Sequence, residues 1–347
     1  MDKPLVTIGI PAYNAEKTIG KTLRSLLNQT YSNIQIHVAD NCSTDKTLQV
    51  VTDLIKIDDR IFLHTLEERI ESHSNLERAL LMCAGQYHAV YHADDVYEPE
   101  MIETAVSILE KDDHVGGVTT RAIFIDENDV MIGQSKTFRQ LGLPASVNYI
   151  TFKMIPLLRL VMHYSNFLIC PTLMFRKELL PIIGEWPRGE NYGTSGDLEV
   201  WLRIAQNAGL AFVSRPLIRY RKSTKQGSYI VHSQRTRPAD FFNVVDHYVN
   251  DPKVSILLTS KDLQHYQSLK DYDSLKCIAR AMVQNEKDLA KKILSRLSFR
   301  EMFFRVFATN LGFKYFIFYL VLKIFIIMPN IFSDKINTFL TNLLKYR

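Results

Sequence analysis

The chain has 347 residues, of which 46% are hydrophobic and 23% are charged, and it contains no repeat or low-complexity segment. This composition excludes a fibrous or disordered protein and indicates one large globular domain with an appendage, or two domains. The net charge of +5 is unevenly distributed, because residues 291–347 carry +8 and the other residues carry −3. A basic end on a mildly acidic body predicts an anionic surface, and no nucleic acid, as its partner.

The cysteines and the first residues indicate the compartment. The cysteines lie far apart, without the paired spacing of a metal site, at Cys42, Cys83, Cys170 and Cys277. We interpret them as free thiols in a reducing environment. Residues 1–4 lead directly into an apolar strand without a secretory signal. We therefore expect a cytoplasmic protein that lies peripherally on the cytoplasmic face of the membrane.

Apolar segments typical of strands alternate with segments of helical spacing through the first third of the chain. The strands are expected at residues 5–10, 34–39, 61–65 and 89–91. The helices are expected at residues 19–27, 48–55, 76–84 and 101–109. Asn14 is expected to cap the first helix. This alternation predicts an α/β protein with a doubly wound, mostly parallel sheet flanked by helices, whose ligands bind beyond the carboxyl ends of the strands.

The middle of the chain has a less regular pattern. Residues 117–126 and 130–133 predict two strands joined by a turn, whereas residues 138–149 have no clear pattern. Residues 166–176 predict a further apolar strand that contains a proline. A polar, aromatic loop over residues 184–194 then leads to a helix that opens at residues 195–203. Asp197 lies near its N-terminus, where the helix dipole favours a carboxylate.

Two adjacent carboxylates follow the apolar run at residues 89–91. In the segment AVYHADDVYEP, Asp94 and Asp95 lie where a strand would direct oxygen ligands to one point at the sheet edge. Mg²⁺ and Mn²⁺ favour such ligands and commonly bind phosphate oxygens as well. Taken alone, the pair is equally consistent with a turn, where Asp is common. No glycine-rich loop follows the first strand, which argues against a dinucleotide site or a P-loop.

Several short motifs follow one another in order between residues 5 and 228. They are VTIGIPAYN at 6–14, DNCSTD at 40–45, AGQY at 84–87, HADD at 92–95, PTLMFR at 171–176, GDLEVWLR at 196–203 and RYR at 219–221. With these motifs in this order, the chain resembles a family 2 glycosyltransferase of the inverting, non-processive, bacterial surface-glycan type. The resemblance implies a GT-A nucleotide-sugar-binding domain over residues 1–228, followed by a helical C-terminal region over residues 229–347.

The resemblance also implies roles for individual residues in a donor site, with a UDP-sugar as the expected donor. Four residues would shape the pocket of the base: Pro11, Ala12, Tyr13 and Asn14. Asp40 would accept a hydrogen bond from a pyrimidine ring. Asp94 would bind the donor near its ribose and share a divalent cation, Mn²⁺ or Mg²⁺, with Asp95. Such a cation would neutralise the departing nucleoside diphosphate.

On the acceptor side, the resemblance implies that Asp197 is the general base that takes the proton of the acceptor hydroxyl. Without the resemblance, Asp197 would be interpreted as an acid that the helix dipole stabilises. The acceptor would be a glycan or a lipid-linked glycan. Trp186 and Tyr192 precede the base and would stack on an acceptor sugar, although a place in the core is an equal alternative.

Two positions depart from the family pattern. His92 stands where the family metal motif commonly has an acid, and we expect it beside the metal ligands rather than among them. Ser223 stands where the family often has a histidine that completes the metal shell. His232 could replace that histidine, although a surface position is the simpler interpretation. These departures leave one alternative function, a non-catalytic subunit that binds the donor within a glycan-assembly complex.

The C-terminal region is expected to be helical, with helices at residues 262–285 and 288–297. Residues 313–328 are strongly apolar but shorter than the roughly 20 residues that span a bilayer. Within a basic, apolar segment at residues 296–330 we expect an interfacial helix on an anionic membrane surface. The alternative is a buried helix that packs on the catalytic domain or on a second copy of the chain. The Gln-x-x-Arg-Trp motif of the family's processive synthases is missing, which implies transfer of a single sugar.

Overall fold

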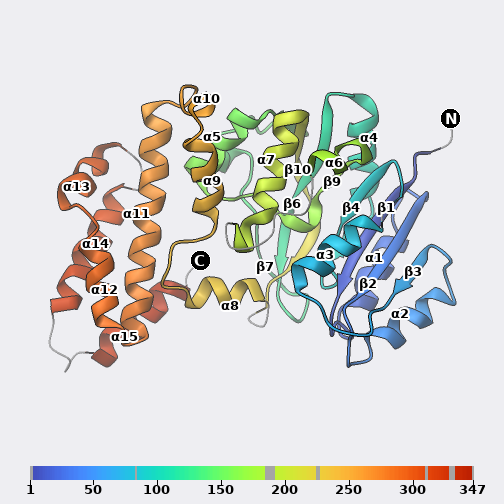
Figure 1. Ribbon diagram of the computed structural model, residues 1–347, viewed down its shortest axis with the longest axis horizontal. Helices are drawn as coiled ribbons and strands as arrows, with labels where there is room; N and C mark the ends of the chain where they lie inside the picture. The colour runs from blue at the N-terminus through green and yellow to red at the C-terminus, as the bar shows by residue number, and fades with distance from the viewer. Residues whose placement is uncertain are drawn as a thin grey trace. The chain divides into compact units, whose positions relative to one another are not determined.

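The computed structural model describes residues 3–82, 84–183, 192–223, 227–308, 312–327 and 333–345. The chain divides into two compact units (Figure 1). Unit 1 comprises Met1–Leu157 and Asn166–Ser223, and unit 2 comprises Leu158–Ser165 and Thr224–Arg347. Within the described residues, every strand belongs to unit 1, and unit 2 is built from helices.

The strands of unit 1 form one sheet in the order β3-β2-β1-β4-β9-β6-β10-β5, with β7 beside β6 and β8 beside β10. Their bounds are β1 Val6–Ala12, β2 Ile34–Asp40, β3 Ile61–His64, β4 Tyr87–Val90, β5 Val96–Tyr97, β6 Val115–Ile125, β7 Met131–Gln134, β8 Tyr149–Phe152, β9 Met174–Arg176 and β10 Gly209–Arg221. The expected hairpin of two strands joined by a turn is the β6–β7 pair, and it is confirmed.

The long registers of the sheet are parallel. Strand β1 pairs with β2, and β6 pairs with β10, along most of their lengths, and β1–β4 and β2–β3 add two shorter parallel pairings. The antiparallel pairings are short and involve β5, β7, β8 and β9. Strand β1 is buried on both faces, as expected of a parallel strand covered by helices. The predicted α/β class with a mostly parallel sheet is therefore confirmed.

The helices of unit 1 follow the predicted apolar spacing. They are α1 Ile19–Leu27, α2 Thr47–Ile55, α3 Ser72–Leu81, α4 Met101–Lys111, α6 Leu180–Ile183 and α7 Gly196–Asn207, and α5 Met154–Tyr164 continues into unit 2. The expected cap at Asn14 is wrong, because α1 begins after Thr18 without a side-chain cap. Asn14 instead adopts a left-handed φ of 48°, which asparagine tolerates, and its side chain accepts a hydrogen bond from the Thr44 backbone at 2.8 Å.

The expected strand over residues 166–176 is also wrong in most of its length. Residues Cys170–Thr172 form a turn of 3₁₀-helix, and only Met174–Arg176 form strand β9. The reason lies in Pro171, which has no N–H to donate to a strand ladder and adopts a non-extended ψ of 30°. Residues 138–149, which have no clear sequence pattern, contain a short turn at Arg139–Leu141 and the start of β8.

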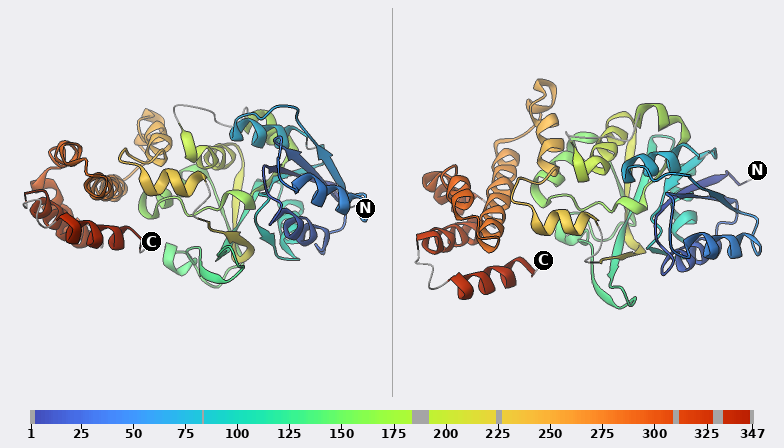
Figure 2. Two further views of the ribbon diagram at one scale, coloured as in Figure 1. Left: turned by 90° about the horizontal axis from the view of Figure 1, so that it is seen from below. Right: turned by 60° about the horizontal axis from the view of Figure 1, so that its bottom comes forward.

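Unit 2 is a set of helices (Figure 1 and Figure 2) around its own apolar core. They are α8 Gly227–Gln234, α9 Phe241–Val249, α10 Pro252–Ser255, α11 Ser260–Val283, α12 Lys287–Leu294, α13 Phe299–Ala308, α14 Gly312–Ile327 and α15 Ser333–Lys345. Helix α11 begins with a capping box, in which Thr259 and Asp262 satisfy each other's backbone N–H groups. Both predicted helices near residues 262–297 are confirmed. Among the described residues, no helix combines the length and apolar character needed to cross a bilayer.

Strand β1 and helix α3 approach each other closely at Gly9. A methyl group built on Gly9 would lie 2.6 Å from the carbonyl carbon of Ala79 and in hard contact with its oxygen. Because both partners are backbone atoms of buried elements, neither can move without displacing the strand or the helix. We expect Gly9→Ala to lower the free energy of unfolding by about 1–3 kcal/mol or more, measured by urea denaturation.

Gly20→Ala, within α1, is the matched control for this prediction. The methyl group at Gly20 would lie 3.2 Å from Val50 Cγ1 and 3.3 Å from Arg24 Nη1, both of which belong to side chains. Its contact is therefore softer, and alanine gains about 1 kcal/mol in helix propensity. We expect a small change at Gly20. Equal denaturation midpoints for Gly9→Ala and the unsubstituted chain would contradict the account of this contact.

Candidate active site

The candidate site lies at the sheet edge where three parallel strands end. Ala12 at the end of β1 pairs with Asp40 at the end of β2, and Gly9 pairs with Val90 at the end of β4. Because neighbouring parallel strands end at the same edge, the segments that follow them begin from adjacent points. The ends of these strands and the segments that follow them contain the predicted base-pocket residues, Asp40 and the paired acids.

The turn at residues 92–95 is fixed by hydrogen bonds from two neighbouring elements. The Thr22 hydroxyl of α1 donates to the backbone oxygen of Asp95 at 2.7 Å. The backbone N–H of His92 donates to the hydroxyl of Tyr97 at 2.9 Å. The loop is therefore held at both ends before any ligand binds, which keeps its carboxylates at the sheet edge.

Arg221, the last residue of β10, supports the same turn from the other side. Its backbone N–H donates to Asp95 Oδ1, and its Nε donates to the backbone oxygen of Asp94, both at 2.8 Å. Its two terminal nitrogens donate to the backbone oxygen of Asp126 at 2.7 Å and to the carboxylate of Asp129 at 2.5 Å. Arg221 therefore connects the paired acids to the β6–β7 turn. The sequence showed this residue only as part of a motif and gave no sign of its contacts.

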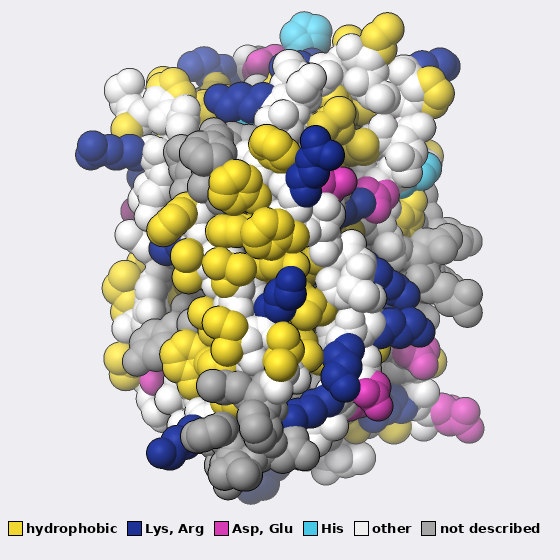
Figure 3. All heavy atoms as spheres, turned by 90° about the vertical axis from the view of Figure 1, so that its left-hand side faces the viewer, with side chains coloured by type: hydrophobic (Ala, Val, Ile, Leu, Met, Phe, Trp, Pro, Cys, Tyr) yellow, Lys and Arg dark blue, Asp and Glu magenta, His cyan; other side chains and the backbone are white. Residues whose placement is uncertain are grey.

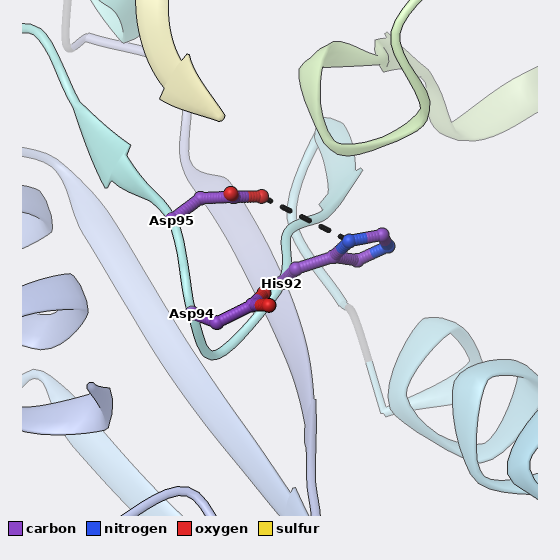
Figure 4. A group of neighbouring side chains, drawn as sticks. All are labelled: His92, Asp94 and Asp95. Carbon is purple, nitrogen blue, oxygen red and sulfur yellow. Dashed lines mark ion pairs between the residues drawn. The ribbon is translucent and has the colours of Figure 1, made fainter. Parts of the chain in front are cut away.

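His92, Asp94 and Asp95 form a compact cluster of potential metal ligands (Figure 4). One ligand atom from each residue lies within 4.8 Å of the other two. The imidazole Nδ1 of His92 faces Asp95 Oδ2 at 3.8 Å, as the dashed line in Figure 4 marks. Asp95 is fully buried, and its Oδ2 has no hydrogen-bond partner within the part of the chain that the structure describes.

These residues fit a divalent cation. Burial, followed by the charge of Asp94, raises the pKa of Asp95 well above its ordinary value, despite the hydrogen bond from Arg221. Burial has the opposite effect on the base His92: it lowers the pKa of the imidazole, although the charge of Asp94 opposes that shift. A bound cation would compensate the charge of the two carboxylates and use the unpartnered oxygen. Two carboxylates with a neutral imidazole suit Mn²⁺ better than Mg²⁺.

Asp197 belongs to the same neighbourhood. It lies in the first turn of α7, is half-buried, and accepts a hydrogen bond from the Leu198 backbone at 2.7 Å. Burial raises its pKa to about 7, although its backbone hydrogen bonds oppose that shift. Burial is the main cause that raises the pKa of the Cys170 thiol and that of the Tyr220 hydroxyl, and the charges of Asp95 and Asp197 add to the shift in both groups. The two carboxylates therefore lie near the same pair of side chains, although they are far apart in sequence.

Asp40 and Asn14 are both hydrogen-bonded to the loop between β2 and α2. The Asp40 carboxylate is buried and accepts two hydrogen bonds from Ser43, one from its backbone and one from its hydroxyl, at 2.9 and 2.5 Å. The Asn14 backbone donates to the Ser43 hydroxyl at 2.9 Å. This network fixes the rim beside the ends of β1 and β2. The neighbouring Asp45 accepts from the backbone of Thr47 at 2.9 Å, as expected of an acid that starts α2.

Tyr13 lies on this rim, and its partner was not apparent from the sequence. Its ring is 39% exposed, and the guanidinium carbon of Arg69 lies 4.1 Å from the ring centroid. The loop that carries Arg69 is fixed by Asn41, whose side chain exchanges hydrogen bonds with the Ile70 backbone at 2.9 Å. Tyr13 and Arg69 thus form a stacked aromatic and cationic pair beside the predicted base pocket.

The remaining predicted residues have different outcomes. Tyr192 is half-buried just before α7, whereas Trp186 lies outside the described residues. Ser223 donates its hydroxyl to Glu127 at 2.5 Å. His232 belongs to α8, but its side chain is outside the described part of the structure. Trp201, on α7, is buried in the core.

An α/β sheet with acids grouped beyond the carboxyl ends of its parallel strands belongs to the class of folds that bind ligands at this edge. A family model described as glycosyl transferase family 2 matches residues 7–180, half of the chain. The protein belongs to this family and is a glycosyltransferase. It is 29% identical over 241 residues to an uncharacterized glycosyltransferase of Haemophilus influenzae, covering 68% of this chain and 71% of the relative.

Solved structures support the GT-A fold. S. aureus TarS 1–349 in complex with UDP has a TM-score of 0.54 at 16% identity and covers 90% of this chain and 89% of its own. The mannosyltransferase PcManGT from Pyrobaculum calidifontis, in complex with GDP-Man and Mn²⁺, has a TM-score of 0.51 at 18% identity and covers 93% and 86%. The predicted GT-A fold with a helical C-terminal region is therefore confirmed.

The raised pKa of Asp197 predicts a pH-dependent gain in stability for Asp197→Asn. The ordinary pKa of 3.8 applies to the unfolded chain, and the folded value is about 7. The unfolded chain loses this proton first as pH rises, so the carboxylate lowers stability progressively from about pH 4 to about pH 7. We expect the melting temperature of Asp197→Asn to exceed that of the unsubstituted chain, by a margin that grows over this range and is constant above it.

Asp113→Asn is the control for this prediction, because the Asp113 side chain is 98% exposed. Its melting temperature should follow that of the unsubstituted chain at every pH. The interpretation of Asp197 as a desolvated acid would be wrong if the difference in melting temperature between Asp197→Asn and the unsubstituted chain did not change with pH.

The contacts of Arg221 predict that Arg221→Lys weakens cation binding. Lysine keeps the backbone donor to Asp95 but cannot reproduce the fork that also reaches Asp126 and Asp129. Changes to groups that orient metal ligands typically reduce affinity about 10–100-fold. We expect about a tenfold rise in the Mn²⁺ concentration that gives half-maximal thermal stabilisation.

Arg219→Lys is the matched control for Arg221→Lys. Arg219 lies two residues earlier on β10, is half-exposed, and pairs with Glu98 at 2.8 Å. Its replacement should leave the Mn²⁺ concentration unchanged. If Arg221→Lys bound Mn²⁺ as the unsubstituted chain does, Arg221 would have no part in orienting the acids.

Proposed function

We propose that the protein transfers one sugar from a UDP-sugar to a hydroxyl group of a glycan or lipid-linked glycan, with inversion at the anomeric carbon. The observation that carries the proposal is the presence of Asp197, a carboxylate of raised pKa, near the cluster of His92, Asp94 and Asp95. Such an arrangement can supply both needs of the reaction, a base for the acceptor and positive charge for the leaving diphosphate.

In the proposed reaction, the acceptor oxygen attacks the anomeric carbon from the face opposite the diphosphate. Asp197 takes the proton of the acceptor hydroxyl. The bond between the anomeric carbon and the diphosphate oxygen breaks, and its electron pair leaves with UDP. A single displacement of this kind inverts the configuration. A divalent cation held by Asp94 and Asp95, with His92 beside or among the ligands, would supply Lewis-acid stabilisation of the departing charge.

The donor proposal is supported by the rim at the ends of β1 and β2. Tyr13 and Arg69 offer a stacked, cationic surface for a base. The Asp40 carboxylate accepts two hydrogen bonds from Ser43 and, with about four lone-pair sites, has capacity for a further donor from a pyrimidine. Pro11 and Ala12 complete this edge. The UDP in TarS and the GDP-Man and Mn²⁺ in PcManGT are consistent with a nucleotide-sugar and a metal here.

The acceptor proposal concerns the loop before α7 and the C-terminal region. Tyr192 lies directly before the helix that carries Asp197, and we assign it, together with Trp186, to an acceptor site. We assign residues 1–228 to catalysis and residues 229–347 to attachment of the enzyme to the membrane surface. The positive charge of residues 291–347 supports a peripheral place on the anionic cytoplasmic face of the membrane, where a lipid-linked acceptor would be available.

The experiment that tests this function uses Asp197→Asn. We expect a loss of about 10²–10⁴-fold in the rate of UDP release from a panel of UDP-hexoses with Mn²⁺, because asparagine cannot take a proton. UDP binding, measured by calorimetry, should persist, since Asp197 is not part of the base pocket.

Asp113→Asn, at an exposed position remote from the acids in sequence, should retain full turnover. Full turnover by Asp197→Asn would remove the base assignment. An unsubstituted chain that binds UDP but turns over no UDP-hexose with any glycan acceptor would favour the alternative of a donor-binding subunit.

A further inference from the structure

Helix α14 has two apolar faces, and only one of them is buried. The inner face packs in the core of unit 2 through Tyr315, Tyr319 and Leu322. The opposite face is exposed to 62%, 44% and 56% at Phe313, Ile317 and Ile324. Because these three positions recur at helical spacing, they form a single stripe along the helix. A surface helix normally presents polar residues on this side, whereas this stripe is apolar and is not covered by any of the described residues.

Helix α13 widens the stripe into a patch. It packs beside α14, with the rings of Phe303 and Phe316 in contact at 5.6 Å between centroids. We define the α13–α14 patch by its exposed members: Phe303, Phe304, Phe313, Ile317, Ile324 and Ile327. Figure 3 looks onto this face and shows apolar side chains gathered in a broad area, with acids confined to its margin. Contiguous exposed apolar areas of this kind mark interaction surfaces.

Basic side chains border and enter the patch. Lys314 and Lys323 are exposed on α14, on opposite sides of the stripe, and α14 contains no acid. Arg300 lies over the ring of Phe304 at 5.8 Å, and Lys323 lies over the ring of Phe299 at 5.9 Å. Long basic side chains around an apolar stripe can extend their charges to a polar boundary while their stems stay in contact with apolar groups.

We propose that the α13–α14 patch docks in the plane of an anionic lipid bilayer. The apolar stripe would enter the acyl boundary, and Lys314, Lys323 and Arg300 would reach the lipid phosphates. A symmetric contact with a second copy is disfavoured, because it would bring the lysines of both copies together and α14 contributes no acid to pair with them. This inference rests on the membrane location in the proposed function and names the surface responsible, but it needs none of the transfer chemistry.

The test is flotation of the full chain with vesicles of phosphatidylcholine alone or mixed with phosphatidylglycerol. We expect the unsubstituted chain to float with the anionic vesicles about tenfold better than with the neutral ones. Lys314→Gln with Lys323→Gln should remove that preference. Ile317→Asn with Ile324→Asn should reduce binding to both vesicles about tenfold or more, because the stripe loses its apolar area. The control is Ile256→Asn, which removes an isoleucine that is 82% exposed elsewhere in unit 2.

Three results would overturn the proposal. The first is an unsubstituted chain that floats with neither vesicle. The second is an Ile256→Asn variant that loses as much binding as the stripe variant. The third is a dimer in gel filtration that becomes a monomer only with Ile317→Asn and Ile324→Asn, which would make a second copy the occupant. UDP calorimetry and thermal melting on the same samples separate the proposals. Lost flotation with intact UDP binding would count against the docking surface alone, and the reverse would count against the donor site alone.

Discussion

The buried carboxylate of Asp95 is the constraint on which the candidate site depends. One of its oxygens accepts a backbone hydrogen bond from Arg221, and the other has no hydrogen-bond partner among the described residues. A buried charge is unfavourable unless a proton, a counter-charge or a cation offsets it, and the adjacent Asp94 increases that demand. The charge of Arg221 offsets only part of this demand, because the pKa of Asp95 stays raised and the terminal nitrogens of Arg221 donate to Asp126 and Asp129. A bound cation could therefore still stabilise the negative charge of the paired acids.

Asp95 and Asp197 differ in the same two respects, burial and hydrogen bonding. The Asp95 carboxylate accepts a hydrogen bond from the backbone of Arg221, whereas Asp197 lies in the first turn of α7 with its pKa raised to about 7. A carboxylate with a pKa near neutrality can both accept and release a proton near pH 7, which suits a general base. A pair of carboxylates with an unused oxygen suits a cation instead. Burial and hydrogen bonding thus give the same residue type two different proton affinities and environments, which is the basis of the two roles that we propose.

Much of the fold could be predicted from the sequence, because its signals are local. Strand and helix periodicity located the parallel strands β1 to β4 and the helices α1 to α4, but not β10, and the polar residues after each strand located the sheet edge. The errors arose where a distant contact decides the local conformation. Asn14 turns toward Thr44 instead of capping α1, and Pro171 interrupts an apolar run that otherwise reads as a strand. The contacts of Arg221 and Arg69 could not be predicted, because their partners lie far away in sequence and no spacing rule connects them.

Sequence periodicity could not show which face of helix α14 is buried, although its composition did indicate an unusual environment. Periodicity identifies the buried face of a helix only when the other face is polar, and α14 is apolar almost all round. The two alternatives left open by the sequence, an interfacial helix and a buried one, are therefore not exclusive. The structure buries Tyr315, Tyr319 and Leu322 in unit 2 and leaves Phe313, Ile317 and Ile324 exposed. An apolar helix that is too short to span a bilayer and carries lysines at the borders of one face has the composition expected of contact with two apolar environments, one of them protein.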